Sequence, residues 1–372
     1  MGKRYLVVGG AGFIGSHLSD ELLQHGHEVR IYDALLPQVH GQAGRWPAYL
    51  GAAVEMLQGD VRDADRLGSA LEGVEGVFHL AARVGVGQSM YEIEEYVAAN
   101  ELGTAALLQL LSQRPVERLV VASSMSVYGE GLYRDRQGRM GEAPRRIASQ
   151  LRAQRWDPLD AEGYRLEPVP TPETKTPDLT SVYALSKYAQ ERMCLMVDEA
   201  YGIETVALRL FNVFGSRQAL SNPYTGVLAI FAARLLNGRP AAVFEDGQQR
   251  RDFVHVRDVA RAFHLAMTTA AAAGQVINIG TGRSYAVAEV ARLLAAGLGR
   301  PEIAPEITGR ARTGDIRHCF ADIRRARELL GFAPAARLET DLDELVGWLD
   351  GQRAEDRVGQ ATAELERRGL VA

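Results

Sequence analysis

Two side chains near the middle of the chain have the types and spacing needed for proton transfer. Tyr183 and Lys187 stand four residues apart, at the start of a segment whose helical periodicity runs through Met196. Both side chains therefore share one helix face. A lysine ammonium close to a phenol lowers the pKa of that phenol from about 10 towards working pH. A tyrosine tuned in this way can take a proton from an alcohol while hydride leaves the carbon.

Ser124 is the third candidate catalytic residue. It follows a predicted strand, 118–122, at the strand end that faces the same crevice. Its hydroxyl could hydrogen-bond the oxygen that is being oxidised. The Tyr-x-x-x-Lys spacing alone is common by chance on helices. It becomes a strong signal only together with this serine and with the opening segment of the chain.

The chain opens with a predicted strand, a glycine turn and a helix. The apolar run 5–8 leads into Gly9, Gly12 and Gly15, a pattern typical of the phosphate end of a dinucleotide site. Gly9 would allow the tight turn, Gly12 would let the backbone approach a pyrophosphate, and Gly15 would let the helix pack closely on the strand. The N-terminus of that helix attracts phosphate.

Acidic residues follow the next two predicted strands, 27–32 and 53–58. Asp33 has the spacing at which a carboxylate meets the adenosine ribose, and it would repel a 2′-phosphate, which favours NAD over NADP. The alternative is that Asp33 only starts a turn. Asp60 could accept from an adenine amino group, or it could cap the helix that begins near Asp63.

The fourth predicted strand, 77–80, ends in small residues that leave room for a cofactor beside the backbone. A long segment with helical periodicity, 92–111, follows and contains Asn100 among apolar neighbours. On the residues alone, Asn100 is better explained as a buried amide that satisfies backbone groups than as a cofactor ligand.

Composition narrows the class of protein. The 372 residues are 47% hydrophobic and 24% charged, which is ordinary for a globular enzyme. A net charge of −5 gives no electrostatic case for nucleic acid as a partner. The two cysteines, Cys194 and Cys319, make no metal-ligand spacing, so no metal site is expected. No signal peptide or membrane-spanning stretch is apparent, and we expect a cytoplasmic protein that does not contact membranes.

Together these motifs resemble the extended short-chain dehydrogenase/reductases, in particular the NAD-dependent sugar epimerase/dehydratase family. The glycine pattern Gly9-x-x-Gly12-x-x-Gly15 is the variant that this group carries, and the resemblance extends to about Trp348. It implies an asparagine at the position of Asn100 that contacts the cofactor. On this resemblance the residues expected to bind NAD are Gly9, Gly12, Phe13, Ile14, Gly15, Asp33, Asp60, Val61, Leu80, Ala81, Ala82, Asn100, Tyr183 and Lys187.

Later motifs resemble the family's nucleotide-sugar contacts. Asn212 lies in Arg-Leu-Phe-Asn-Val-Phe-Gly, Arg251 in Arg-Asp-Phe-Val-His, and Arg312 with Asp315 in Arg-Thr-Gly-Asp. Arginine suits a diphosphate because its planar fork meets phosphate oxygens bidentately. The expected substrate-binding residues are Arg83, Ser124, Asn212, Arg251, Arg312, Asp315 and Cys319. His255 and Asp258 are expected to be structural.

The resemblance also implies an α/β architecture, a Rossmann doubly wound parallel sheet with a smaller, mostly C-terminal substrate lobe. The expected NAD-binding domain is 1–211, with an insertion at 130–180. The substrate lobe is then 212–350, with 250–280 returning to the first domain. The tail, 351–372, is expected to be a solvated terminal helix. Family members usually form homodimers through a four-helix bundle, made by the helices that hold Asn100 and Tyr183.

The residues after Ser124 discriminate among reactions of the family. Dehydratases carry an Asp-Glu pair where this chain has Met125 and Ser126, and UDP-glucuronate decarboxylases carry Glu at the position of Ser126. Neither Met nor Ser can transfer a proton as a carboxylate does. This pattern favours a 4-epimerase, which oxidises C4 of the sugar and returns hydride to the opposite face. The alternatives are an NADPH-dependent 4-keto-sugar reductase and a non-catalytic Rossmann sensor.

Two features bear on the choice of sugar. Cys319 falls where epimerases carry a residue that sets pocket size, so a small side chain suggests a broad pocket. The insertion resembles that of dTDP-L-rhamnose 4-epimerases, since it closes on Pro-Val-Pro-Thr-Pro-Glu173. We expect a partly ordered flap and no strand pair, because prolines fix the backbone and like charges repel. It could be a substrate lid or a solvated loop. Its arginines are Arg134, Arg136, Arg139, Arg145, Arg146, Arg152 and Arg155.

Overall fold

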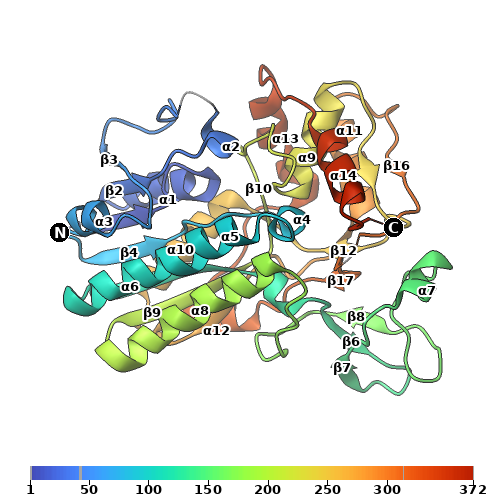
Figure 1. Cartoon of the computed structure of the whole chain (residues 1–372), viewed down its shortest axis with the longest axis horizontal. Helices are drawn as coiled ribbons and strands as arrows, with labels where there is room; N and C mark the ends of the chain where they lie inside the picture. Colours follow the sequence, from blue (N-terminus) through green and yellow to red (C-terminus); the bar gives the residue numbers. More distant parts are fainter. Residues whose placement is uncertain (1, 42–43, 313, 372) are drawn as a thin grey trace.

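The core of the molecule is a parallel seven-stranded sheet, as predicted for a Rossmann fold (Figure 1). The structure is a computed structural model and describes residues 2–41, 44–312 and 314–371. The strand order β14-β9-β5-β4-β1-β2-β3 reverses between β1 and β4, which places a binding crevice at their carboxyl ends. The strands are β1 (Arg4–Val8), β2 (Glu28–Asp33), β3 (Val54–Gln58), β4 (Gly76–His79), β5 (Arg118–Ser124), β9 (Glu204–Leu210) and β14 (Val276–Ile279).

Helices cover both faces of this sheet, because alternate strand residues point to opposite sides. Val7 packs in one buried cluster with residues of three helices, whereas Leu6 and Val8 pack in another cluster with three different helices. The first face carries α1 (Phe13–Gln24), α10 (Val256–Thr268) and α12 (Arg324–Leu330). The second face carries α3 (Ala64–Ala70), α6 (Gly103–Gln113) and α8 (Val182–Tyr201).

The helix predicted at 92–111 forms, but it is not regular throughout. α5 (Ile93–Tyr96) continues through a π-helical turn (Val97–Leu102) into α6. Asn100 lies within this turn and is completely buried. Single π turns inside α-helices are frequent at functional sites. The periodicity of the sequence therefore predicted the helix but could not reveal the turn.

A second core lies in the C-terminal part of the chain. α9 (Val227–Leu236), α11 (Val287–Gly297) and α13 (Leu338–Leu349) pack together in one apolar cluster. α10 and β14 belong instead to the core of the main sheet. The exact domain boundaries stay a prediction. The short strands are β10 (Asn212–Phe214) with β13 (Phe253–His255), β11 (Ala242–Val243) with β16 (Glu306–Ile307), and β15 (Tyr285–Ala286) with β12 (Arg250–Arg251) and β17 (His318–Cys319).

The insertion does contain paired strands, so the expectation of no strand pair is wrong. β6 (Leu132–Arg134) pairs antiparallel with both β7 (Met140–Glu142) and β8 (Glu167–Val169), and α7 (Ala148–Arg152) follows β7 (Figure 1). Repulsion among the seven arginines is offset because five of them pair with an acidic or aromatic side chain. The pairs are Arg134–Glu167 at 2.8 Å, Arg139–Asp135 at 2.6 Å, Arg145–Asp178 at 2.5 Å and Arg146–Glu245 at 2.6 Å, and Arg136 lies over the Tyr164 ring.

The C-terminal tail was expected to be a solvated helix. Its helix instead packs against the rest of the protein. α14 (Val358–Arg367) buries Leu365 against Gly87 of the short helix α4 (Val86–Ser89). Beyond α14, Val371 forms a β-bridge with Arg312. This terminal segment with few apolar residues packs against two distant parts of the chain, near Gly87 and near Arg310. Among the described residues, no helix is both long and apolar enough to cross a membrane.

Candidate active site

Tyr183 and Ser124 meet where the carboxyl end of β5 faces the first turn of α8. The Ser181 hydroxyl oxygen accepts a hydrogen bond from Ala184 N at 3.1 Å, which fixes the start of α8. This cap places Tyr183 on the first turn, where its hydroxyl lies close enough to Ser124 for that residue to affect the Tyr183 pKa. The structure therefore brings the two candidate catalytic residues together at the end of β5, and their catalytic roles stay a prediction.

Ser126 orients Ser124, a role that the sequence did not reveal. Ser124 Oγ accepts hydrogen bonds from Ser126 N at 3.1 Å and from Ser126 Oγ at 2.9 Å. The short 3₁₀ turn Met125–Tyr128 brings the two serines together. A hydroxyl at position 126 thus serves to hold Ser124 and not to transfer protons as a carboxylate would.

Lys187 is buried and its ammonium is held by Gln190. Lys187 Nζ donates to Gln190 Oε1 at 2.6 Å, and burial lowers the pKa of Lys187 to about 8. Gln190 Nε2 in turn donates to Thr104 Oγ1 at 2.8 Å and to Ala81 O at 3.3 Å, with His79 Nε2 at 3.2 Å. Gln190 has no exposed surface. It is therefore a positioning residue that links Lys187 to the end of β4 and to the first turn of α6.

The predicted lowering of the Tyr183 pKa by Lys187 is not found. Burial raises the pKa of Tyr183 above that of an ordinary phenol, and the nearby Ser124 side chain acts in the opposite direction. The Lys187 ammonium donates to Gln190 and lies one helical turn from Tyr183 on the same face of α8. The spacing of four residues predicted that Tyr183 and Lys187 share one helix face. It could not predict that the Lys187 ammonium donates to Gln190.

The glycine loop has the shape that a dinucleotide requires. Gly9 has φ +84°, and a Cβ there would lie 2.7 Å from Ala81 N. A Cβ on Gly15 would lie 2.5 Å from Gly9 O, so α1 can approach β1 only with glycine. At Gly12 the nearest atom would be Gly9 O at 3.4 Å, which leaves space before the N-terminus of α1. Phe13 and Ile14 form the first turn behind it. The residues present therefore fit a bound pyrophosphate.

Asp33 lies beside this loop at the end of β2. Its Oδ2 accepts from Ala11 N at 3.0 Å and its Oδ1 from Leu35 N at 2.8 Å. His40 Nε2 lies 3.7 Å from the same carboxylate. Asp33 thus starts a turn and also presents a carboxylate next to the phosphate loop, so the two interpretations of the sequence are compatible. The location fits a ribose and disfavours a 2′-phosphate.

The other residues expected to bind NAD include one acid that is paired with an arginine and several apolar residues. Asp60 is held by Arg62, whose Nη2 lies 2.7 Å from Asp60 Oδ2. Asp63, and not Asp60, caps α3 by accepting from Arg66 N at 3.1 Å. Leu80, Ala81 and Ala82 follow β4 directly, and Val61 is buried.

The Asn100 side chain makes three hydrogen bonds within the protein. Its Oδ1 accepts from Arg83 N at 2.7 Å, and its Nδ2 donates to Arg83 O at 3.1 Å and to Ser186 Oγ at 2.9 Å. These bonds join the loop after β4 to α8. The geometry shows that Asn100 satisfies the Arg83 backbone, and the contact with NAD that the family resemblance implies stays a prediction.

Three expected substrate residues converge on one turn. Arg312 Nη2 lies 3.0 Å from Asp315 Oδ2, and Arg251 Nη2 lies 3.6 Å from Asp315 Oδ1. Arg251 also donates to Ile316 O at 2.7 Å. Thr313, which the motif includes, lies outside the described residues. Two guanidinium groups beside one carboxylate leave a net positive charge, which suits a diphosphate.

The other expected substrate-binding residues, Asn212, Arg83 and Cys319, lie in three different surroundings. Asn212 Oδ1 is buried and has no hydrogen-bond partner among the described residues, so it can accept from a ligand. Arg83 pairs with Glu92 at 3.1 Å and Glu95 at 3.2 Å. Cys319 is buried in one cluster with Met125 and Tyr128, and its Sγ lies 3.8 Å from Thr171 Oγ1.

His255 and Asp258 do shape the fold, as expected. His255 Nδ1 accepts from Arg257 N at 3.2 Å and caps α10. Asp258 accepts from Ala335 N and Ala336 N, both at 3.0 Å.

Comparison with known proteins agrees with this site. The model of the NAD dependent epimerase/dehydratase family matches residues 5–146 and 163–280. A dTDP-L-rhamnose 4-epimerase of Burkholderia thailandensis is 35% identical, over 94% of this chain and 95% of its own length. A putative UDP-glucose 4-epimerase of Methanocaldococcus jannaschii is 32% identical, over 92% of this chain and 97% of its own.

Solved structures of 4-epimerases are similar to this chain over nearly its whole length. The UDP-glucose 4-epimerase of Thermotoga maritima with UDP-glucose has a TM-score of 0.76 at 30% identity and covers 94% of this chain and 99% of its own. The Thermus thermophilus UDP-glucose 4-epimerase with NAD has a TM-score of 0.74, also at 30% identity with the same coverage. The chain therefore belongs to the NAD-dependent epimerase/dehydratase family, uses NAD as its cofactor and is an isomerase of the 4-epimerase kind.

Proposed function

We propose that the protein interconverts dTDP-L-rhamnose and dTDP-6-deoxy-L-talose by epimerisation at C4. The observation that carries the 4-epimerase chemistry is that the Tyr183 phenol faces Ser124 at the end of β5, where the next two residues, Met125 and Ser126, carry no carboxylate. The choice of sugar nucleotide is supported by similarity to the Burkholderia thailandensis enzyme along nearly the whole of both chains.

In this mechanism the chain's own residues bind, orient and move one proton. Ser124 Oγ, held by Ser126, hydrogen-bonds the C4 oxygen of the sugar. Tyr183 accepts the C4 hydroxyl proton and gives it back in the return step. The glycine loop and Asp33 would hold NAD, which would supply the acceptor and donor for the C4 hydride. Because hydride must return to the other face, the sugar has to turn while Arg251 and Arg312 hold the diphosphate.

A panel of sugar nucleotides tests the substrate. We expect dTDP-L-rhamnose to give its C4 epimer without added cofactor, resolved by NMR, and UDP- and GDP-sugars to react more slowly. If the protein epimerises only UDP-sugars, the proposed substrate is wrong but the chemistry stands. Consumption of added NADPH with a keto sugar would instead identify a reductase.

We also propose that the insertion forms one wall of the nucleotide end of the site. Arg146 is almost fully buried, and its Nη2 donates to Asp315 O at 2.9 Å. Its Nη1 lies 2.6 Å from Glu245, which also pairs with the buried Arg317 at 2.9 Å. This buried ion network joins the insertion to the turn that carries Asp315. The contact favours a substrate-facing lid over a solvated loop.

The tail is expected to support the same turn. Glu366 pairs with Arg310 at 2.6 Å, and Val371 bridges to Arg312, so detaching α14 should loosen the phosphate contacts. We predict that Leu365→Asp raises the KM for the sugar nucleotide about tenfold, a loss of about 1.4 kcal/mol in binding, with little change in kcat. Gln360→Asp, an exposed position on the same helix, serves as the control in steady-state assays. Equal KM values for the two variants would contradict this role.

We propose that the protein is a homodimer formed through α5, α6 and α8. Large apolar side chains on this helical layer are exposed, with Leu102 at 61%, Leu185 at 49% and Met196 at 56%. Exposed apolar patches of this kind mark interaction sites.

We predict that a Leu102→Glu, Leu185→Glu double variant is monomeric by light scattering, with unchanged circular dichroism. Ile147→Glu changes an equally exposed residue on the insertion and should leave the dimer intact. A dimeric double variant would rule out this interface.

A further inference from the structure

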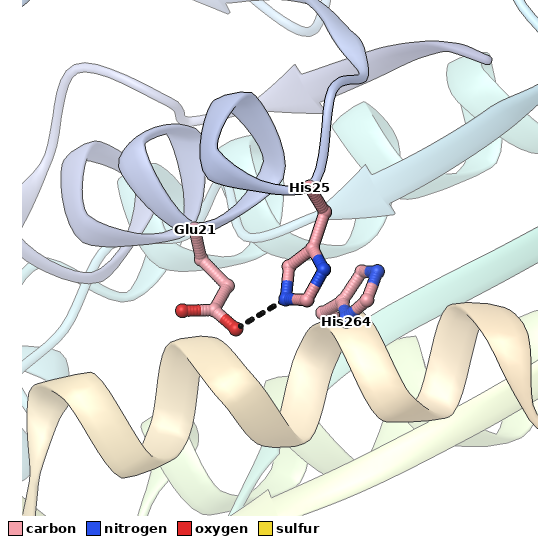
Figure 2. Close-up of side chains that lie close together, drawn as sticks. All are labelled: Glu21, His25 and His264. Atoms are coloured by element: carbon pink, nitrogen blue, oxygen red, sulfur yellow. Dashed lines mark hydrogen bonds and ion pairs between the residues drawn. The ribbon is translucent and has the colours of Figure 1, made fainter. Parts of the chain in front are cut away.

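Two histidines and a glutamate gather at the end of α1 that lies away from the glycine loop. Glu21 lies on the last turns of α1 and His25 directly follows the helix, so the two are four residues apart on one face. His264 comes from α10, which packs against α1 (Figure 2). None of the three has a part in the chemistry described above.

Their donor atoms lie close together. One donor atom from each residue falls within 4.8 Å of the other two. His25 Nε2 lies 3.2 Å from Glu21 Oε1, and the rings of His25 and His264 stack with centroids 3.9 Å apart at 16° (Figure 2). Donors bound to a tetrahedral zinc ion at ~2.1 Å lie about 3.4 Å from one another, so a small closure brings all three into range.

The backbone beneath the cluster is fixed while the side chains can adjust. Leu18 and Leu22 of α1 pack with Phe263 of α10 in the main core, without exposed surface. His25 is exposed, and Glu21 and His264 are half-buried. The rings can therefore turn out of the stack about their side-chain bonds and direct one nitrogen each towards Glu21.

We propose that Glu21, His25 and His264 bind one divalent transition-metal ion of the zinc type, with water as the fourth ligand. Two imidazole nitrogens and a carboxylate are a donor set that zinc prefers, whereas magnesium prefers oxygen ligands. The ion links α1 to α10 and stabilises the helical layer that carries the glycine loop. The cysteine spacing of the sequence could not indicate such a site, because its ligands come from distant segments.

The test uses full-length, tag-free protein treated with a chelator and then titrated with Zn²⁺ or Co²⁺. We expect about one ion per chain with a Kd in the micromolar range or tighter, a Co²⁺ absorption spectrum of tetrahedral type, and a zinc-dependent rise in melting temperature. His25→Ala and His264→Ala should each weaken binding at least about tenfold, and Glu21→Gln should weaken it less. Mg²⁺ should leave the melting temperature unchanged.

Glu28→Gln is the matched control, since Glu28 is an exposed carboxylate on the neighbouring strand β2 and lies outside the cluster. It should bind zinc as the parent does. Circular dichroism of the metal-free variants verifies that each one folds. The proposal is overturned if the parent does not bind zinc below about 100 µM. It is equally overturned if both histidine variants bind as tightly as the parent, in which case the rings form only a stacked pair.

Discussion

Replacing Tyr183 by Phe is expected to lower kcat about a thousandfold or more while the KM for the sugar nucleotide changes little. The substitution removes only the hydroxyl that faces Ser124 and keeps the ring packed against Tyr96. Without that hydroxyl, no group at the end of β5 can accept the C4 proton, and general acid–base catalysis commonly contributes 10²–10⁴-fold. Initial rates of epimer formation, followed by NMR, measure the loss.

Tyr201→Phe provides the control for this prediction. Tyr201 is the last residue of α8 and is largely exposed, so the same chemical change there should leave kcat within twofold or so of the parent. Both variants should retain bound NAD, measured after denaturation by its absorbance. A Tyr183→Phe variant that turns over as fast as Tyr201→Phe would show that another group is the base, and the assigned mechanism would be wrong.

The parts of the site that the sequence could predict depend on local spacing. Gly9 and Gly15 are required by the close approach of neighbouring backbone, and this requirement appears directly as a pattern of glycines. Tyr183 and Lys187 share a helix face because they are four residues apart. The parallel strands also followed from short apolar runs, because strands buried on both faces are continuously apolar.

The parts that could not be predicted depend on partners from distant segments. Gln190 meets Thr104 and His79, and the arginines of the insertion find acids such as Glu245 far along the chain. The tail shows no signal of its own, yet Leu365 packs on Gly87 because the fold brings them together. Repulsion between the arginines was used to predict that the insertion has no paired strands. That prediction was wrong because the arginines pair with acidic residues, some of them distant in the sequence.

Gln190 should control the pH dependence of the reaction through Lys187. Burial lowers the Lys187 pKa to about 8, so in the parent the ammonium is lost as the pH rises through that value. Gln190→Glu places a carboxylate where Oε1 now lies 2.6 Å from Nζ, which favours the charged form and raises the Lys187 pKa. Gln190→Leu removes the acceptor and lowers the Lys187 pKa further. The alkaline limb of kcat should therefore move to higher pH in Gln190→Glu and to lower pH in Gln190→Leu, each by about one unit.

Gln190→Leu should also lower kcat about tenfold at pH 9 but only about twofold at pH 7, since lowering a pKa of about 8 by one unit still leaves about half of the Lys187 side chains charged at pH 7. Gln113→Glu adds the same charge at the exposed end of α6 and should leave the profile unchanged, because water screens it. A purely structural role for Gln190 predicts something different: both variants would lose stability and activity equally at all pH values. Opposite movements of the two limbs, with the control unmoved, can arise only if Gln190 acts through the charge of Lys187.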